Sequence, residues 1–164
     1  MGKQEKNSLI LLKGVAEMAL AKIVYASLTG NTEEVADVVA EALENLNIDV
    51  TVDECTQVEA TEFEEADICV VATYTYGDGE LPDEIIDFYE ELQELDLSGK
   101  IYGVCGSGDT FYDDFAKSVD DFDLAFAKTG ATKGAEVVKV DLNVEAEDID
   151  NLEEFAKKMV AALN

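Results

Sequence analysis

Short runs of apolar residues alternate with amphipathic stretches along most of this 164-residue chain. Five of the runs are rich in Val and Ile and have the length of strands that are buried on both faces. They predict strands at Lys22–Ala26, Asp49–Glu54, Asp67–Thr73, Lys100–Gly106 and Glu136–Leu142, and apolar positions at helical spacing predict helices at Thr32–Leu46, Asp83–Leu95, Tyr112–Lys128 and Asp148–Leu163. This alternation indicates an α/β fold, a doubly wound five-stranded parallel sheet with helices on both faces.

The connection Thr56–Ala66 is acidic and less regular than the helical stretches, although Phe63 gives it an apolar side chain to bury. A doubly wound sheet binds its ligand at the carboxyl ends of the strands, near the point where the strand order reverses. We therefore expect the functional loops after the first, third and fourth strands.

The loop after the first predicted strand has the composition of a phosphate-binding turn. It reads Ser27-Leu28-Thr29-Gly30-Asn31-Thr32 and leads into a predicted helix. Backbone N–H groups and the helix dipole favour an anion at such a helix N-terminus. The loop has no Lys or Arg, which distinguishes it from the GxxxxGK[ST] nucleotide loop. The alternative is that Thr29, Asn31 and Thr32 only cap the helix.

The loops after the third and fourth strands combine glycine with aromatic residues. They read Thr73-Tyr74-Thr75-Tyr76-Gly77-Asp78-Gly79-Glu80-Leu81-Pro82 and Gly106-Ser107-Gly108-Asp109-Thr110-Phe111-Tyr112. Glycine lets the backbone approach a ligand closely, and an aromatic side chain can stack on a flat ring. Either loop alone could be a surface turn, but three unusual loops at one sheet edge predict a binding site.

The chain is strongly acidic, which narrows the range of its partners. It has 38 Asp and Glu against 11 Lys and Arg, a formal net charge of −27. Such a field disfavours nucleic acid and anionic membrane surfaces and attracts basic protein surfaces, although solubility alone could also explain the charge.

Three cysteines, Cys55, Cys69 and Cys105, are widely spaced and lie in apolar surroundings. Because the chain has no His and no CxxC pair, they predict buried thiols in a reducing cytoplasm rather than a metal site. The apolar run Leu9–Leu12 is too short for the core of a signal peptide, and we find no membrane span.

Through its three loops the chain resembles the flavodoxins, in particular the short-chain type. The resemblance covers about Ala21 to the C-terminus, and the long insertion that divides the fifth strand of the long-chain group is missing. It implies the sheet order 2-1-3-4-5 and non-covalently bound FMN, which carries single electrons between larger redox proteins. It also implies that the loops bind this cofactor through Ser27, Leu28, Thr29, Gly30, Asn31, Thr32, Thr73, Thr75, Tyr76, Gly77, Asp78, Ser107, Gly108, Asp109 and Tyr112.

Three of these residues have specific roles in the resemblance. Tyr112 resembles the tyrosine that stacks on one face of the flavin ring, and Tyr76 stands where many flavodoxins have a tryptophan on the other face. Gly77 resembles the glycine whose peptide turns over when the flavin gains a proton at N5. The turned carbonyl then accepts a hydrogen bond that stabilises the half-reduced state.

Acidic residues close to the ring predict a low potential. A carboxylate about 10 Å away opposes the charge of the fully reduced flavin by roughly 1.7 kcal/mol, or about 70 mV, at an effective dielectric constant of about 20. Asp78, Glu80 and Asp109 are the candidates. We expect a monomeric electron carrier rather than an enzyme. This carrier should dock to basic surfaces of redox proteins such as a flavodoxin reductase and electron acceptors.

Three other kinds of protein share part of this pattern. A phosphorylated receiver domain has the same topology, but it needs an Asp at the end of the third strand, where this chain has Thr73. An FMN-dependent reductase with its own small-molecule substrate needs a further pocket, for which the short loops offer little material. An acidic interaction module would explain the charge but not the loops.

Residues 1–17 do not fit the predicted domain, which spans residues 18–164. The codons of Lys13-Gly14-Val15 can read AAAGGAGTN, which resembles a ribosome-binding site upstream of Met18. We therefore expect Met18 to be the true start and residues 1–17 to be a translated leader or added sequence. The alternative is an amphipathic N-terminal arm.

Overall fold

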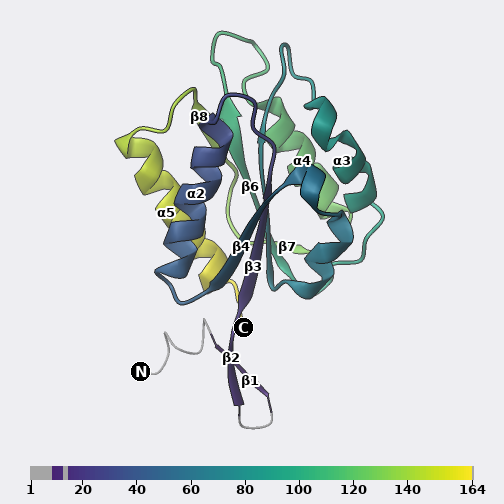
Figure 1. Ribbon diagram of the computed structural model, residues 1–164, viewed down its shortest axis with the longest axis vertical. Helices are drawn as coiled ribbons and strands as arrows, with labels where there is room; N and C mark the ends of the chain where they lie inside the picture. The colour runs from purple at the N-terminus through teal and green to yellow at the C-terminus, as the bar shows by residue number, and fades with distance from the viewer. Residues whose placement is uncertain (1–8, 13–14, 164) are drawn as a thin grey trace.

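The computed structural model describes residues 9–12 and 15–163 and has a parallel sheet at its centre (Figure 1). The sheet contains β3 (Leu20–Tyr25), β4 (Asp49–Glu54), β5 (Ile68–Tyr74), β6 (Ile101–Gly108), β7 (Thr132–Lys133) and β8 (Val138–Asp141). The strand order is β4-β3-β5-β6, and both β7 and β8 pair with the outer edge of β6. Together β7 and β8 take the place of the fifth strand, so the predicted order 2-1-3-4-5 is confirmed.

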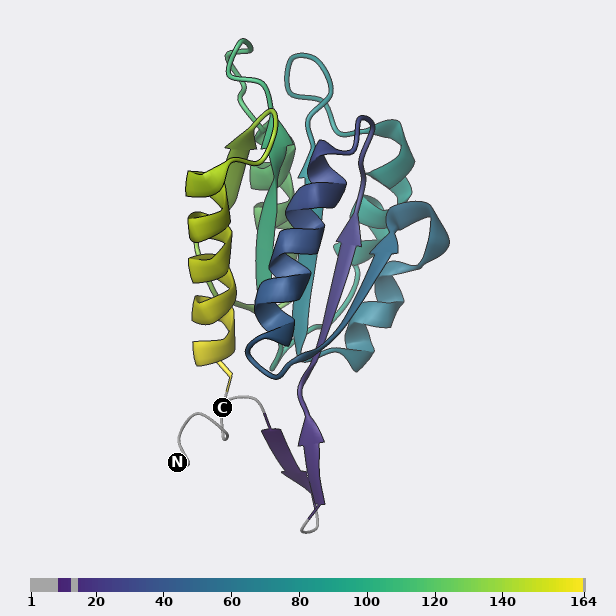
Figure 2. The same ribbon diagram turned by 60° about the vertical axis from the view of Figure 1, so that its left-hand side comes forward.

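Helices cover both faces of the sheet, as Figures 1 and 2 show. Helices α2 (Asn31–Glu44) and α5 (Ala146–Ala161) pack side by side on one face. Helices α3 (Ile86–Leu92) and α4 (Lys117–Ala127) lie on the other, with 3-10 helices at Cys55–Gln57, Ala60–Glu65 and Asp83–Ile85. Each helix turns an apolar stripe to the sheet, and the two resulting clusters of buried side chains hold the three layers together.

Two predicted helices have different bounds from those expected. The helix predicted at Tyr112–Lys128 begins only at Lys117, because the preceding residue, Ala116, has a left-handed backbone with φ of 50°. The helix predicted at Asp83–Leu95 is a 3-10 turn followed by the shorter α3, since Ile85, with φ of −108° and ψ of 0°, lies away from the regular α-helical angles. The other two helices and the first four strands lie within two residues of their predicted bounds.

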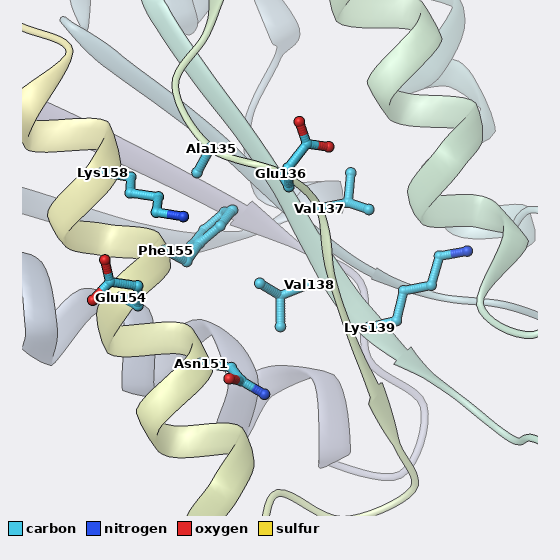
Figure 3. A pocket seen from close by; sticks show the side chains of 9 residues that line it. All are labelled: Ala135, Glu136, Val137, Val138, Lys139, Asn151, Glu154, Phe155 and Lys158. Atoms are coloured by element: carbon cyan, nitrogen blue, oxygen red, sulfur yellow. The ribbon is translucent and has the colours of Figure 1, made fainter.

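The fifth strand is divided, and its first part, β7, was not predicted. Residues 134–137 lie opposite only residues 103–104 of β6, so the edge strand bulges away from the sheet between β7 and β8. Figure 3 shows the hollow between this bulge and α5, with a volume of about 330 Å³. The Lys139 side chain points away from α5, and its ammonium group binds Asp120 at 2.6 Å. The hollow therefore follows from the bulge and contains no residue of the three loops.

The acidic connection Thr56–Ala66 contains the end of the 3-10 helix Cys55–Gln57 and the whole of the 3-10 helix Ala60–Glu65. Phe63 is buried as expected, and its ring meets the edge of Phe88 with 5.6 Å between the ring centroids. The connection therefore closes the helical layer that contains α3 and α4.

An N-terminal hairpin lies apart from the main sheet. Its strands β1 (Leu9–Leu12) and β2 (Val15–Met18) pair antiparallel as a separate two-stranded sheet. Figure 2 shows it extending beyond the end of the main sheet that is opposite the loops. Residues 1–8 and Lys13-Gly14 lie outside the described residues, and a start at Met18 stays a prediction. Over residues 9–12 and 15–163, no helix has both the length and the apolarity that crossing a membrane requires.

Candidate functional site

The three predicted loops meet at the carboxyl ends of β3, β5 and β6, at the top of Figure 1. The strand ends are hydrogen-bonded neighbours: Ala26 N–H donates to the Ala72 carbonyl, and Tyr74 is paired in register with Ser107. Parallel pairing therefore brings together segments that are separated by up to about eighty residues.

The loop Ser27–Thr32 is shaped by Ser27 and Gly30. The Ser27 hydroxyl accepts hydrogen bonds from the N–H groups of Gly30 at 3.0 Å and Glu33 at 3.3 Å. Gly30 precedes α2 with φ of +96°, a conformation that favours glycine. Within the described part of the chain, the N–H groups of Asn31 and Thr32 donate to no protein acceptor. Two free donors at the positive end of α2 fit an anion.

Thr32 does not cap α2. Its hydroxyl lies 2.6 Å from the Ser107 hydroxyl at the end of β6, and both side chains are almost completely buried. The capping alternative is therefore wrong for Thr32. The bond ties the loop Ser27–Thr32 to the loop after β6.

The segment Tyr76–Glu80 is a closed turn. The Tyr76 N–H donates to the Glu80 carbonyl at 2.8 Å, and the Glu80 N–H donates to the Tyr76 carbonyl at 2.9 Å. At its tip Gly77 has φ of +52°, and a Cβ added there would meet no atom within 4 Å. The Gly77 peptide is therefore in open space, at a residue that adopts several backbone conformations at low cost.

The loop that carries Tyr112 is held by Asp109 and by the end of β8. Asp109 accepts hydrogen bonds from the N–H groups of Phe111 and Tyr112, at 2.9 and 3.1 Å. The Asp141 carboxylate accepts from both the N–H and the hydroxyl of Thr110, each at 3.1 Å. Sequence reasoning missed Asp141, although its place at the end of the fifth predicted strand was a usable signal.

Large apolar side chains are exposed on these loops. The exposed fractions are 70% for Leu28, 58% for Tyr76, 83% for Phe111 and 37% for Tyr112. Exposed aromatic residues beside free N–H donors fit a ligand that combines a phosphate with a flat ring. The residues present therefore fit FMN.

Two further predicted site residues, Thr73 and Thr75, also have hydrogen-bond partners within the chain. The Thr73 side chain is buried, and its hydroxyl donates to the Tyr74 carbonyl at 3.0 Å. The Thr75 hydroxyl accepts from the N–H of Ser118 in α4 at 3.0 Å. The direct role of Thr73 and Thr75 in cofactor binding stays a prediction.

The charges at this edge are almost all negative. Asp78, Glu80, Asp113 and Asp114 are exposed on the two aromatic loops. Lys117 follows the second of these loops and Lys139 lies opposite Gly106 in the sheet, and they are paired with Asp121 and Asp120 respectively.

The three cysteines are free and buried, and burial raises the pKa of the Cys55, Cys69 and Cys105 thiols to about 12. Among the described residues, no group of three or more His, Cys, Asp or Glu side chains is placed to hold a metal ion.

The fold and the loops together define an α/β protein with a site for a phosphorylated, ring-bearing cofactor. The family model for flavodoxin matches residues 23–155. The chain is 36% identical to "Probable flavodoxin 2" of Bacillus subtilis, over 89% of this chain and 100% of that protein. The chain belongs to the flavodoxin family, whose members bind FMN and carry electrons.

Two solved structures agree with this assignment. The flavodoxin of Streptococcus pneumoniae TIGR4 is 67% identical with a TM-score of 0.87, over 88% of this chain and 100% of that one. A short-chain flavodoxin associated with a PDU bacterial microcompartment is 51% identical with a TM-score of 0.88, over 90% of this chain and 100% of that one. The chain is a flavodoxin of the short-chain type.

Proposed function

We propose that this chain is a low-potential one-electron carrier that moves electrons between redox proteins with basic docking surfaces. When bound, FMN supplies the redox chemistry, since it takes up and releases electrons one at a time. The chain supplies the loop Ser27–Thr32 to bind the phosphate, the turn Tyr76–Glu80 to contact the ring, and the charges around them.

The observation that carries this proposal is the one-sided charge of the aromatic loops. Residues 73–82 and 106–116 contain five carboxylates and no Lys or Arg. Carboxylates around the ring oppose a further negative charge on it, which lowers the potential of the second electron. The same exposed carboxylates attract a basic protein surface towards the ring edge and raise the association rate.

One further feature agrees with an intracellular carrier. Three buried free thiols support a reducing cytoplasmic location. We propose that the carrier acts as a monomer, which gel filtration of the FMN-loaded chain would test.

The test is a potentiometric titration of the FMN-loaded chain combined with stopped-flow electron transfer to cytochrome c, a basic one-electron acceptor. We expect a second midpoint potential well below that of free FMN and a transfer rate that falls steeply as NaCl is raised from 20 to 500 mM. A rate independent of salt would exclude electrostatic docking. Turnover of a small-molecule acceptor faster than transfer to the protein would favour the alternative, an FMN-dependent reductase.

A further inference from the structure

Both ends of the turn Tyr76–Glu80 are attached to helix α4 through one residue, Ser118. The Ser118 N–H donates to the Thr75 hydroxyl at 3.0 Å, directly before the turn. The Ser118 hydroxyl donates to the carbonyl of Glu80, the last residue of the turn, at 3.3 Å. Ser118 is completely buried, so its N–H and hydroxyl groups would lack a water partner if these bonds were lost.

The bond to Thr75 also supplies a cap that α4 lacks. The residue before the helix is Ala116, whose side chain has no hydrogen-bonding group. Ser118 is the second residue of α4, and its N–H is one of the donors that a helix leaves without an internal partner. Thr75 therefore caps α4 from a position 43 residues earlier in the chain.

The base and the tip of the turn have opposite surroundings. A Cβ added at Gly79 would lie 3.0 Å from Asp114 Cβ and 3.1 Å from Lys117 Cδ, so the returning arm packs against the start of α4. Gly77 at the tip has open space around it. The contacts fix the two arms and leave the tip peptide free to reorient.

We propose that Ser118 and Thr75 are positioning residues for the flavin ring. They hold the two arms of the turn Tyr76–Glu80 in the conformation in which Tyr76 contacts the ring. The turn is therefore already ordered before FMN binds. Preorganisation of this kind strengthens binding because the entropy cost is met on folding. The inference rests on the proposed placement of the ring beside Tyr76.

The experiment uses the full-length, FMN-loaded chain and its variants Ser118→Ala and Thr75→Val. Two further variants serve as controls. Thr75→Ser keeps the accepting oxygen, and Ser98→Ala removes a hydroxyl that donates to Asp96 in an exposed turn before β6. Three quantities are measured: amide hydrogen exchange at Tyr76 and Glu80, the FMN dissociation constant from fluorescence recovery on dilution, and the first one-electron midpoint potential.

We expect exchange at both amides to be about five- to tenfold faster in Ser118→Ala and Thr75→Val, since one buried hydrogen bond changes an equilibrium constant by roughly this factor. The FMN dissociation constant should rise by a similar factor, and the first midpoint potential should shift. Thr75→Ser should restore the wild-type values, and Ser98→Ala should leave them unchanged.

Unchanged exchange at Tyr76 and Glu80 would show that Ser118 and Thr75 do not hold the turn. Faster exchange with an unchanged dissociation constant and potential would overturn the positioning role. A wild-type chain that binds no FMN would instead overturn the proposed function. The difference in hydrogen exchange between the wild type and the variants would still show whether Ser118 and Thr75 hold the turn.

Discussion

The bond between Thr32 and Ser107 should contribute measurably to stability before any cofactor binds. Its oxygens are 2.6 Å apart, and the side chains are 1% and 4% exposed. Ser107→Ala leaves the Thr32 hydroxyl buried without this partner, which costs about 1–3 kcal/mol. Thr32→Val leaves the Ser107 hydroxyl in the same state and should cost a similar amount.

The double variant removes both hydroxyls and leaves neither unsatisfied. We therefore expect it to be less destabilised than the sum of the single variants by about 1–2 kcal/mol. Urea unfolding of the FMN-free chain in phosphate-free buffer measures this difference. With a slope of about 2 kcal/mol per M, each single substitution should lower the urea midpoint by roughly 1 M.

Ser98→Ala is the matched control, because it also removes a serine hydroxyl bonded at 2.6 Å, but in an exposed turn. Its effect should stay within about 0.5 kcal/mol. If the two single effects add up to that of the double variant within about 0.5 kcal/mol, the buried pair does not interact and our account of this loop fails.

Three further predictions concern the ring loops and the thiols. Gly77→Ala should still bind FMN, because a Cβ there meets no atom within 4 Å. In this variant the rotation of the peptide at residue 77 should cost roughly 1 kcal/mol of backbone strain, which lowers the first midpoint potential by about 40 mV. An unchanged potential in a spectroscopic titration would exclude a role for this peptide. Asp141→Asn removes one of the two oxygen acceptors that Asp141 offers to Thr110, and it should raise the FMN dissociation constant about fivefold, as measured by fluorescence quenching. An unchanged dissociation constant would show that β8 does not hold the loop that carries Tyr112. Because burial raises the pKa of Cys55, Cys69 and Cys105 to about 12, the thiols stay protonated at pH 8 and should react with Ellman's reagent only after unfolding in urea; rapid reaction of the native chain would contradict their burial.

The regular elements could be predicted because their signals are local. The strand β5 is an apolar run buried on both faces, and its bounds differ by one residue from the prediction. The sheet order followed from the alternation of strands and helices together with the family resemblance. The parallel sheet predicted that the three loops lie at the carboxyl ends of the strands, and their composition predicted a binding site there.

The start of α4 could not be predicted, because it is decided by distant residues. Apolar positions such as Phe115, Val119 and Phe122 have helical spacing, so the pattern extended the helix backwards to Tyr112. In the structure the helix begins where Thr75 caps Ser118. No signal within residues 112–118 indicates a cap that comes from another loop.

The same reason applies to Thr32. Its position at the start of a predicted helix left a cap open as the alternative to phosphate binding, whereas in the folded chain its hydroxyl pairs with a hydroxyl 75 residues away. The fifth strand also makes tertiary contacts that the apolar pattern does not show, since a Cβ at Gly134 would lie 2.5 Å from Ile101 Cγ2. Pairing between distant residues decides each of these features.

The supports of the site come from both faces of the sheet. The loop Ser27–Thr32 leads into α2, which packs in one apolar cluster, whereas Ser118 belongs to α4, which packs in the other. The Tyr112 loop is attached to β8 at the sheet edge. A cofactor that contacts all three loops therefore connects parts of the chain that are otherwise joined through the sheet. Because such a ligand binds the folded chain and not the unfolded one, we expect FMN to stabilise the arrangement of both helical layers at once.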